Sequence, residues 1–419
     1  MDKKVCLINL GCKVNKYELD CVATILKENG YEVLVEKEKT DYYVVNTCAV
    51  TNEAEKKSRQ YIGKLSKLNP QAKIIVMGCA SQANPKQFQD KNNVIAVSGT
   101  TAREKILDYI EGWNGELPEL PKEYTDLGNP TQTKTRAYIK IQDGCDNFCS
   151  YCIIPYIRGR SRSRKLEDCV KEAKILSLDS KEIVVTGIDM SSYTVDGKPA
   201  LGQLMRALGE VKESRFRIGS LEVGVVTKDF LEDLKSMPNF CPHFHLSLQS
   251  ASDKVLYKMN RHYTFGEYYA KVKLIRKYFP NANITTDLIV GFPTEDEKEF
   301  RVTKKNVKKV GFGDMHIFPF SMKSGTVASR LKDLDGATKK ERVHEIEMIA
   351  DRSRTKYLKR NIRKTHELLI EEKVGDYFVG YTENYIKTYV KGNFPIGEII
   401  KITTTTLFQD GMLGCIVEE

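Results

Sequence analysis

Short apolar runs and helical stretches alternate along residues 1–112. The runs "KKVCLINLGC", "YEVLV", "DYYVVNTC", "AKIIVMGC" and "NVIAVSG" are typical of buried strands. The stretches "NKYELDCVATILKENG" and "TNEAEKKSRQYIGKLSKLNP" have helical spacing, and Thr51 is placed to cap the second helix. Because strands that alternate with helices form parallel sheets, we predict an open parallel α/β domain here.

The same alternation resumes after residues 113–134, a stretch with Pro, Gly and Asn that is typical of a linker. Six apolar runs then lie within residues 135–355, and helical stretches separate most of them. They are "AYIKIQ", "EIVVTGI", "RFRIGSLE", "HFHLSLQS", "NITTDLIVGF" and "DMHIFPFS". Six strand–helix units predict a full or partial parallel barrel, of the TIM-like (β/α)6 kind, with its site at the C-terminal ends of the strands.

The last part of the chain, residues 356–419, changes character. A basic helical stretch leads into "ELLIEE", "YFVGYTENYIKTYVK", "GEIIKITTTTLF" and "GCIVEE", which are rich in β-forming residues with turn residues between them. This pattern predicts a small antiparallel β-barrel.

The composition limits the compartment and the partners. The chain has 419 residues, 11 cysteines and a net charge of +10. An odd number of cysteines in a long chain argues against an extracellular disulfide framework. The start "MDKKVCLINLGCKVN" is too short in uncharged residues for a signal peptide, and no apolar run approaches the length of about 18 residues that a membrane span needs. We expect a cytoplasmic protein without a membrane span, and the charge permits a polyanionic partner.

Three closely spaced cysteines follow the first strand of the predicted barrel, in "DGCDNFCSYC". Cys145, Cys149 and Cys152 have no further cysteine before Cys169 and no histidine before His243. A structural zinc site requires four ligands, and a disulfide would leave one of the three thiols unpaired. A zinc site and a disulfide therefore both fit poorly. A four-iron cluster held by three thiolates fits better, and it leaves one iron open to a small molecule.

A second set of three cysteines is spread over the first segment. Cys12, Cys48 and Cys79 each follow one of the predicted strands. Because the C-terminal ends of parallel strands share one rim, these thiols are expected to meet there. We predict a second three-thiolate cluster; the alternative is three independent buried thiols.

Four arginines in "RGRSRSR" come shortly after the first cysteine triplet. They are Arg158, Arg160, Arg162 and Arg164. Since arginine makes bidentate contacts with phosphate, we predict that this stretch binds RNA. The alternative is a charged loop that only contacts solvent.

The spacing CxxxCxxC after the first strand of a βα barrel resembles the radical S-adenosylmethionine (SAM) enzymes, with Tyr151 at the aromatic position before the third cysteine. Together with "LGCKVN", "NTCAV", "GCASQ" and a tail like a TRAM domain, the chain resembles the methylthiotransferase family over its whole length. Within that family, "LGCKVN" and "CIIPYIRGRSRSR" are most similar to the MtaB type, which acts on N6-threonylcarbamoyladenosine in tRNA.

The resemblance implies further site residues. "TGID" places Gly187 and Asp189 where the family binds the methionine part of SAM, "HLSLQS" offers Gln249 as a SAM contact, and "TTDLIVGFPTE" places Asp287 near the reacting centre. Asp189 capping a loop and Gln249 satisfying buried backbone are the alternatives. "GFPTE" and "FSMKSGT" depart from the commoner "GFPGE" and "YSxRxGT" in loops. The TRAM-like RNA-binding tail offers four possible RNA contacts: Tyr381, Tyr385, Lys387 and Lys391.

The activity that the resemblance implies is insertion of a methylthio group at C2 of N6-threonylcarbamoyladenosine (t6A to ms2t6A) beside the tRNA anticodon. Two [4Fe–4S] clusters and SAM are the implied cofactors, and tRNA, an external electron donor and a sulfur donor are the implied partners of a monomer. Alternative substrates are isopentenyladenosine tRNA and a ribosomal-protein aspartate. An iron–sulfur electron carrier and an RNA-binding protein with degenerate metal sites are alternatives of other classes.

Overall fold

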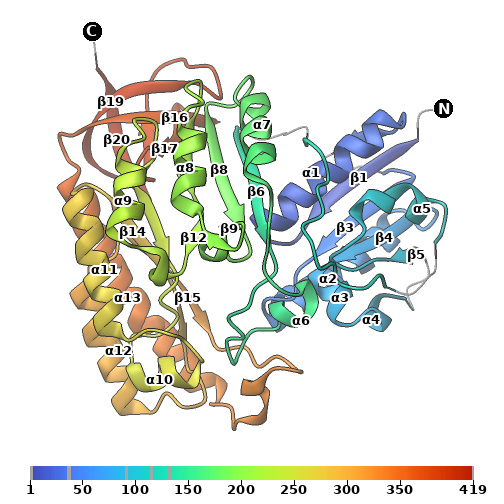
Figure 1. The fold of residues 1–419 in the computed structure, drawn as a ribbon, viewed down its shortest axis with the longest axis horizontal. Coiled ribbons are helices and arrows are strands. Elements are labelled where there is room, and N and C mark those ends of the chain that lie inside the picture. The colour runs from blue at the N-terminus through green and yellow to red at the C-terminus, as the bar shows by residue number, and fades with distance from the viewer. Residues whose placement is uncertain (1–2, 35–38, 90–92, 114–116, 131–134, 418–419) are drawn as a thin grey trace. The chain divides into compact units, whose positions relative to one another are not determined.

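The computed structural model describes residues 3–34, 39–89, 93–113, 117–130 and 135–417 (Figure 1). Contacts divide the chain into two compact units. The first is Met1–Thr133, Lys140–Arg164 and Ser321–Arg330, and the second is Lys134–Ile139, Lys165–Phe320 and Leu331–Glu419. Two later segments, Lys140–Arg164 and Ser321–Arg330, therefore belong to the first unit, and the domain limits at residues 112, 134 and 355 stay predictions. Asn52, for example, donates hydrogen bonds to Ser321 Oγ (3.1 Å) and to the Met322 carbonyl (2.9 Å).

A five-stranded parallel sheet forms the centre of the first unit, in the order β2-β1-β3-β4-β5. Its strands are β1 (Lys4–Asn9), β2 (Glu32–Leu34), β3 (Tyr42–Thr47), β4 (Lys73–Gly78) and β5 (Val94–Val97). The predicted open parallel sheet is confirmed; Val35 of the run "YEVLV" lies outside the described residues.

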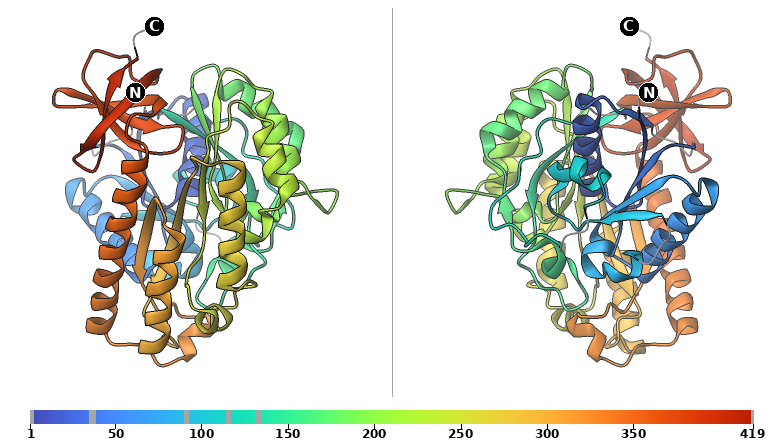
Figure 2. Two further views of the ribbon diagram at one scale, coloured as in Figure 1. Left: turned by 90° about the vertical axis from the view of Figure 1, so that its left-hand side faces the viewer. Right: turned by 90° about the vertical axis from the view of Figure 1, so that its right-hand side faces the viewer.

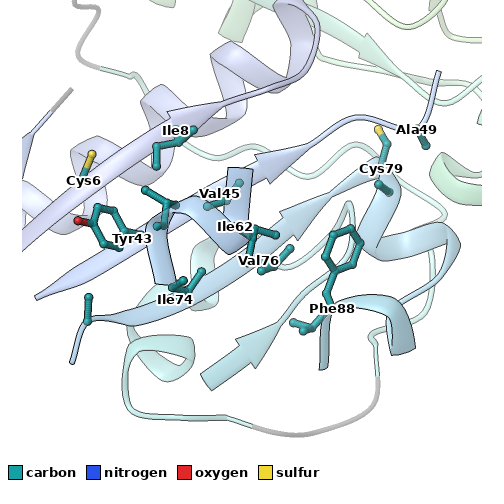
Figure 3. Packing of buried hydrophobic residues seen from close by; sticks show 14 of the residues in the cluster. Cys6, Ile8, Tyr43, Val45, Ala49, Ile62, Ile74, Val76, Cys79 and Phe88 are labelled. Atoms are coloured by element: carbon teal, nitrogen blue, oxygen red, sulfur yellow. The ribbon is translucent and has the colours of Figure 1, made fainter. Parts of the chain in front are cut away.

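Helices cover both faces of this sheet. They are α1 (Lys13–Glu28), α2 (Asn52–Leu68), α3 (Cys79–Ala83), α4 (Lys86–Gln89), η1 (Arg103–Lys105) and α5 (Ile106–Ile110). Figure 3 shows Val45 and Val76 packed with Ile62 of α2 on one face. Val44 packs on the other face in a separate cluster. Burial on both faces explains why these strands are continuous apolar runs. The cap predicted at Thr51 is confirmed, since its Oγ1 accepts from the Ala54 backbone N–H at 3.1 Å.

Six longer strands build the barrel of the second unit, and β6 runs on from this unit into the first. They are β6 (Arg136–Asp143), β8 (Glu182–Gly187), β11 (Arg215–Ile218), β13 (His243–Leu246), β14 (Asn283–Val290) and β15 (Asp314–Pro319). They form two sheets, β11-β8-β6-β7 and β12-β13-β14-β15, where β7 is Arg162–Ser163 and β12 is Ser220–Leu221. The pairs β8–β11, β13–β14 and β14–β15 are parallel, which confirms the predicted partial barrel.

Helices follow the barrel strands as predicted. The α-helices are α6 (Ile154–Arg158), α7 (Leu166–Leu176), α8 (Leu201–Gly209), α9 (Lys228–Lys235), α10 (Asp253–Lys258), α11 (Phe265–Tyr278), α12 (Glu297–Val310) and α13 (Gly336–Arg360). Short elements in loops are η2 (Met190–Ser192), β9 (Thr194–Val195), β10 (Lys198–Pro199), η3 (Val223–Val225) and η4 (Val327–Arg330). Among the described helices, none combines the length and the apolar character that crossing a membrane demands.

A closed five-stranded barrel ends the chain, and Figure 2 shows α13 leading directly into it. Its strands are β16 (Thr365–Val374), β17 (Tyr377–Thr382), β18 (Lys387–Val390), β19 (Ile399–Phe408) and β20 (Gly411–Ile416). The predicted small barrel is confirmed with one difference, because β18 and β20 pair in parallel. Leu368, Phe378 and Ile402 belong to its core.

A buried carboxylate joins the C-terminal barrel to the strands before it. Glu182 is fully buried and forms ion pairs with Arg136 (2.7 Å), Arg215 (2.7 Å) and Arg217 (2.8 Å). Arg215 and Arg217 also donate to backbone carbonyls of the barrel, for example Arg215 to Glu367 at 2.8 Å. Burial alone would raise the pKa of Glu182, but the three guanidinium groups hold it far below its usual value.

Replacing Glu182 with Gln is expected to lower the free energy of unfolding by about 3–5 kcal/mol at neutral pH, because buried guanidinium groups lose the charge that balances them. Denaturant unfolding measures this. Since folding depresses the pKa of Glu182, its contribution is present above the usual carboxyl pKa and is lost as the pH falls toward the folded-state value. The difference in free energy of unfolding between the parent and the Glu182→Gln variant should therefore become smaller at acidic pH.

The matched control is Glu210→Gln, since Glu210 is exposed and its nearest cation, Lys212, is exposed as well. It should change the free energy of unfolding by no more than about 0.5 kcal/mol. Equal stability of the Glu182→Gln chain and the parent at neutral pH would show that the buried ion pairs contribute nothing.

Candidate functional site

Cys12, Cys48 and Cys79 lie at one rim of the N-terminal sheet. They follow β1, β3 and β4, three strands that are neighbours in the sheet. Thr47 at the end of β3 pairs with Gly78 at the end of β4. The cysteines that follow them, Cys48 and Cys79, are therefore at equivalent positions just beyond the two strand ends. The topology therefore confirms the placement that the sequence predicted for these three residues.

Asn15 connects two of these thiols. The Sγ of Cys12 lies 3.3 Å from Asn15 Oδ1, and the Sγ of Cys79 lies 3.9 Å from the same oxygen. Asn15 Nδ2 donates to Asn46 Oδ1 at 2.9 Å, and Asn46 Nδ2 donates back to the Asn15 carbonyl at 2.9 Å. Gly78 has φ +109°, and a Cβ there would lie 2.4 Å from Asn46 Oδ1, so this approach needs glycine. The rim is thus fixed by buried hydrogen bonds.

The electrostatics of the rim show that its thiols affect one another. Burial raises the pKa of Cys12 and raises that of Cys48 to about 11, and the thiol of Cys79 raises both further. Two cations oppose this: Arg158 lowers the pKa of Cys12, and Lys323 lowers that of Cys48. Because their pKa values are raised, these thiols become thiolates only when a positive centre such as a metal binds them.

The second triplet occupies the loop after β6. Cys145, Cys149 and Cys152 are half-buried. Two sulfur atoms face backbone donors, because the N–H of Asn147 lies 3.5 Å from Cys145 Sγ and the N–H of Ile154 lies 3.5 Å from Cys152 Sγ. Such donors stabilise the thiolate that a metal needs.

The loop is closed by a tight backbone approach at its start. Gly144 has φ +72°, and a Cβ there would lie 1.9 Å from the Arg160 carbonyl oxygen. The N–H of Cys145 donates to the Gly159 carbonyl at 3.1 Å. The first cysteine of the triplet is therefore held against the turn that ends α6.

Arg158 links the second triplet to the rim. It ends α6, the short helix that begins just after Cys152, and its side chain is 1% exposed. Its Nε donates to Cys79 Sγ at 3.4 Å, and its terminal nitrogens contact Glu18 (2.7 Å) and Asp143 (3.1 Å). Burial alone would raise the pKa of Glu18, but Arg158, together with further cations, holds it well below its usual value. Arg158 therefore belongs to the interior of the site.

This finding corrects the prediction that "RGRSRSR" binds RNA. Three of the four arginines are buried: Arg158, Arg162 and Arg164. Arg164 pairs with Asp126 at 3.0 Å and donates to the Tyr17 hydroxyl at 3.3 Å, while Arg162 donates to the Arg158 carbonyl at 2.8 Å. Their guanidinium groups are thus occupied inside the protein and are not available to phosphate.

Arg160 is the exposed member of the four, with 73% of its side chain accessible. It pairs with Asp146 at 3.2 Å and lies over the ring of Phe148, 4.5 Å from its centroid. The RNA prediction is therefore wrong for three arginines and stays a prediction for Arg160.

Asp287 lies in the second unit between two histidines that sequence reasoning missed. Its Oδ2 is 3.2 Å from His245 Nε2, and its Oδ1 is 3.1 Å from His316 Nδ1. Burial alone would raise the pKa of Asp287, but hydrogen bonds from both imidazoles lower it far below its usual range. The register pairs Asp287 with His316 across β14 and β15, so a parallel alignment of the runs "TTDLIV" and "DMHIFP" contains the signal.

The other predicted SAM residues also lie in the second unit. Gln249 has φ +62°, and its backbone pairs with β14: its N–H donates to the Asp287 carbonyl (2.9 Å) and its carbonyl accepts from the Ile289 N–H (2.8 Å). Gly187 ends β8, and Asp189 holds the N-cap position of η2 without a capping hydrogen bond from its side chain. The structure brings Gln249 and Asp287 together; the roles of Tyr151, Gly187, Asp189, Gln249 and Asp287 toward SAM stay predictions.

Two aromatic residues of the C-terminal barrel are engaged inside the second unit. Tyr381 and Tyr385 stack on each other with centroids 4.6 Å apart, and Tyr385 stacks on His243 at 4.6 Å. Arg217 lies over the Tyr385 ring at 4.7 Å. Both rings are half-buried, and these contacts occupy part of their faces. Lys387 pairs with Asp410 at 2.9 Å. RNA contacts at Tyr381, Tyr385, Lys387 and Lys391 stay predictions.

Comparison with known proteins agrees with this architecture. Residues 4–99 match the family described as Uncharacterized protein family UPF0004, and residues 139–307 match the Radical SAM superfamily. In the solved structure of a radical S-adenosylmethionine methyltransferase, TsrM, from Kitasatospora setae, the fold is similar with a TM-score of 0.56 at 15% identity, over 76% of this chain and 75% of that one.

Curated relatives cover nearly the whole chain. Threonylcarbamoyladenosine tRNA methylthiotransferase MtaB of Bacillus subtilis is 38% identical over 98% of this chain and 96% of its own length. The protein of the same name from Thermotoga maritima is 37% identical over 99% and 97%. A tRNA-2-methylthio-N(6)-dimethylallyladenosine synthase from Oceanobacillus iheyensis is 32% identical over 100% and 85%. The chain therefore belongs to the threonylcarbamoyladenosine tRNA methylthiotransferases, within the radical SAM superfamily.

Proposed function

We propose that this chain converts N6-threonylcarbamoyladenosine beside the tRNA anticodon to its 2-methylthio derivative. The observation that carries the proposal is full-length similarity, at 38% and 37% identity, to two enzymes named for this substrate. The relative named for dimethylallyladenosine is 32% identical. The two cysteine triplets of the first unit supply the donor atoms that such chemistry requires.

We assign one [4Fe–4S] cluster to each triplet: Cys12, Cys48 and Cys79 for the first, and Cys145, Cys149 and Cys152 for the second. The residues fit these groups, because thiolates are the usual ligands of iron–sulfur clusters and three of them leave one iron open. Backbone N–H groups face two of the sulfur atoms, and Arg158 and Lys323 offset negative charge at the rim. When bound, the clusters and SAM supply the electron, the radical chemistry and the sulfur atom.

The chain's own residues position these groups. Asn15 and Asn46 fix the rim, and Gly144 lets the second loop close. In the second unit, hydrogen bonds from His245 and His316 keep Asp287 ionised. Its carboxylate can therefore accept a hydrogen bond from a ligand bound in the barrel. We assign Gly187, Asp189 and Gln249 to SAM binding, and Tyr151 to the same cofactor.

The remaining partners follow from the chemistry. Reductive cleavage of SAM requires an external electron donor, and each turnover consumes a sulfur atom that a donor must replace. We propose that the enzyme acts in the cytoplasm as a monomer, with Arg160 among its RNA contacts.

Nucleoside mass spectrometry tests the proposed reaction. Protein reconstituted anaerobically with iron and sulfide, then given SAM, a reductant and tRNA bearing threonylcarbamoyladenosine, is expected to yield the 2-methylthio nucleoside. A parallel reaction on isopentenyladenosine tRNA should give little product. Product from the isopentenyl tRNA alone would overturn the substrate while keeping the reaction. Deoxyadenosine formation without product from either tRNA would point to the ribosomal-protein substrate instead.

A further inference from the structure

Six cationic side chains line one groove of the second unit, on the helices that cover β14 and β15. They are Arg276 of α11, Lys308 and Lys309 of α12, and Arg352, Lys356 and Arg360 of α13. The groove has a volume of about 450 Å³, and its lining contains no acidic residue. We call it the α11–α13 groove.

These cations lack the acidic partners that surface cations usually have. In the described part of the chain, none of the six forms an ion pair with a carboxylate. Arg276 donates to the Gly311 carbonyl at 2.9 Å, and its pKa is lowered by burial and by the charge of Arg360. The groove therefore gathers like charges that repel one another.

Helix dipoles explain only part of this arrangement. Cations in the last turn of a helix interact favourably with its C-terminal carbonyls, which accounts for Lys308, Lys309 and Arg360. Arg352 and Lys356, however, lie earlier in α13, and the spacing of four places them on one face with Arg360. Like charges at this spacing destabilise a helix, so the stripe opposes folding unless an anion neutralises it.

The helix α13, which carries three of the six cations, leads into the C-terminal barrel of the same unit (Figure 2). Asn361, the residue after Arg360, accepts from Asn384 of the barrel at 3.2 Å, and Lys364 reaches Asn281, which lies between α11 and β14, at 2.6 Å. Gly311 in the lining belongs to the short loop between α12 and β15, so the groove lies near the start of this strand, whereas sites of such barrels lie at the C-terminal ends of the strands.

We infer that the α11–α13 groove binds the phosphate backbone of the tRNA substrate, away from the nucleotide that reacts. The inference rests on the proposed function for the identity of the RNA. Arg352 and Arg360 are eight residues apart, or about 12 Å along the helix axis, so the stripe is long enough to face several consecutive phosphates. Arginine offers bidentate contacts to phosphate and lysine offers a point charge, so we expect the groove to bind phosphates without base specificity.

The test replaces Arg352, Lys356 and Arg360 together with Gln and measures tRNA affinity by filter binding at several salt concentrations. The matched control replaces three exposed lysines elsewhere in the unit, Lys228, Lys298 and Lys340, which changes the net charge equally. The groove variant should bind about tenfold more weakly, and the slope of log K against log salt should fall by about 2–3, since each phosphate contact contributes about 0.7–0.9. The control should lose less than about twofold.

The outcomes separate this inference from the proposed function. Equal loss of affinity in both variants, or an unchanged salt slope in the groove variant, would contradict the inference that the groove binds tRNA. Neither result would bear on the proposed reaction. With saturating tRNA the groove variant should methylthiolate at the parent rate while its KM rises. If the parent makes no methylthio product but only the groove variant loses tRNA affinity, tRNA binding by the groove is supported and the proposed reaction is contradicted. Circular dichroism of both variants verifies folding.

Discussion

Replacing Cys145, Cys149 and Cys152 together with Ala is expected to remove about half of the bound iron and all formation of 5′-deoxyadenosine from SAM. Replacing Cys12, Cys48 and Cys79 together should remove the other half of the iron and abolish the methylthio product, while SAM cleavage continues. The reason is that the two triplets are separate ligand sets, one in a loop after β6 and one at the rim of the N-terminal sheet.

Iron and sulfide analysis, with electron paramagnetic resonance of the reduced protein, measures the first effect. Chromatography of deoxyadenosine and of tRNA nucleosides measures the second. Cys415→Ala is the control, because Cys415 is exposed in β20 and belongs to neither triplet. A protein that keeps all its iron after either triple replacement would contradict the assignment. Loss of deoxyadenosine formation in the rim variant would show that the two sites are not independent.

Local sequence signals were sufficient for the strands and for the rim. Parallel strands buried on both faces leave continuous apolar runs, and a cysteine directly after such a run must lie at the strand's end. This rule places Cys12, Cys48 and Cys79 at one rim, and the neighbouring positions of β1, β3 and β4 confirm it.

Long-range charge pairing could not be predicted in the same way. Glu18 lies in α1 among apolar residues, and its partner Arg158 is 140 positions further along the chain. A run of arginines has the same appearance in sequence whether it contacts phosphate or buried carboxylates. The His245–Asp287–His316 cluster was missed for a related reason, because its members come from three strands that only the register of the barrel aligns.

Replacing Arg158 with Gln should therefore destabilise the protein by about 3–5 kcal/mol, because Glu18 and Asp143 lose a buried partner. Thermal or denaturant unfolding measures this loss. Since Arg158 helps to keep the pKa of Glu18 depressed, the parent's advantage should be greatest above the usual carboxyl pKa and should shrink as the pH falls. Arg158→Lys keeps the charge but not the planar fork, so it should recover only part of the stability.

Arg160→Gln is the matched control, because it removes the same charge from the same short stretch at an exposed position. Its free energy of unfolding should change by no more than about 0.5 kcal/mol. Its tRNA binding should weaken, and the slope of log K against log salt should fall by the amount expected for one phosphate contact. A stable Arg158→Gln chain with weakened tRNA binding would restore the original interpretation of "RGRSRSR" as an RNA grip. Loss of iron from the rim in that variant would instead show that the Arg158 contact to Cys79 holds the cluster site together.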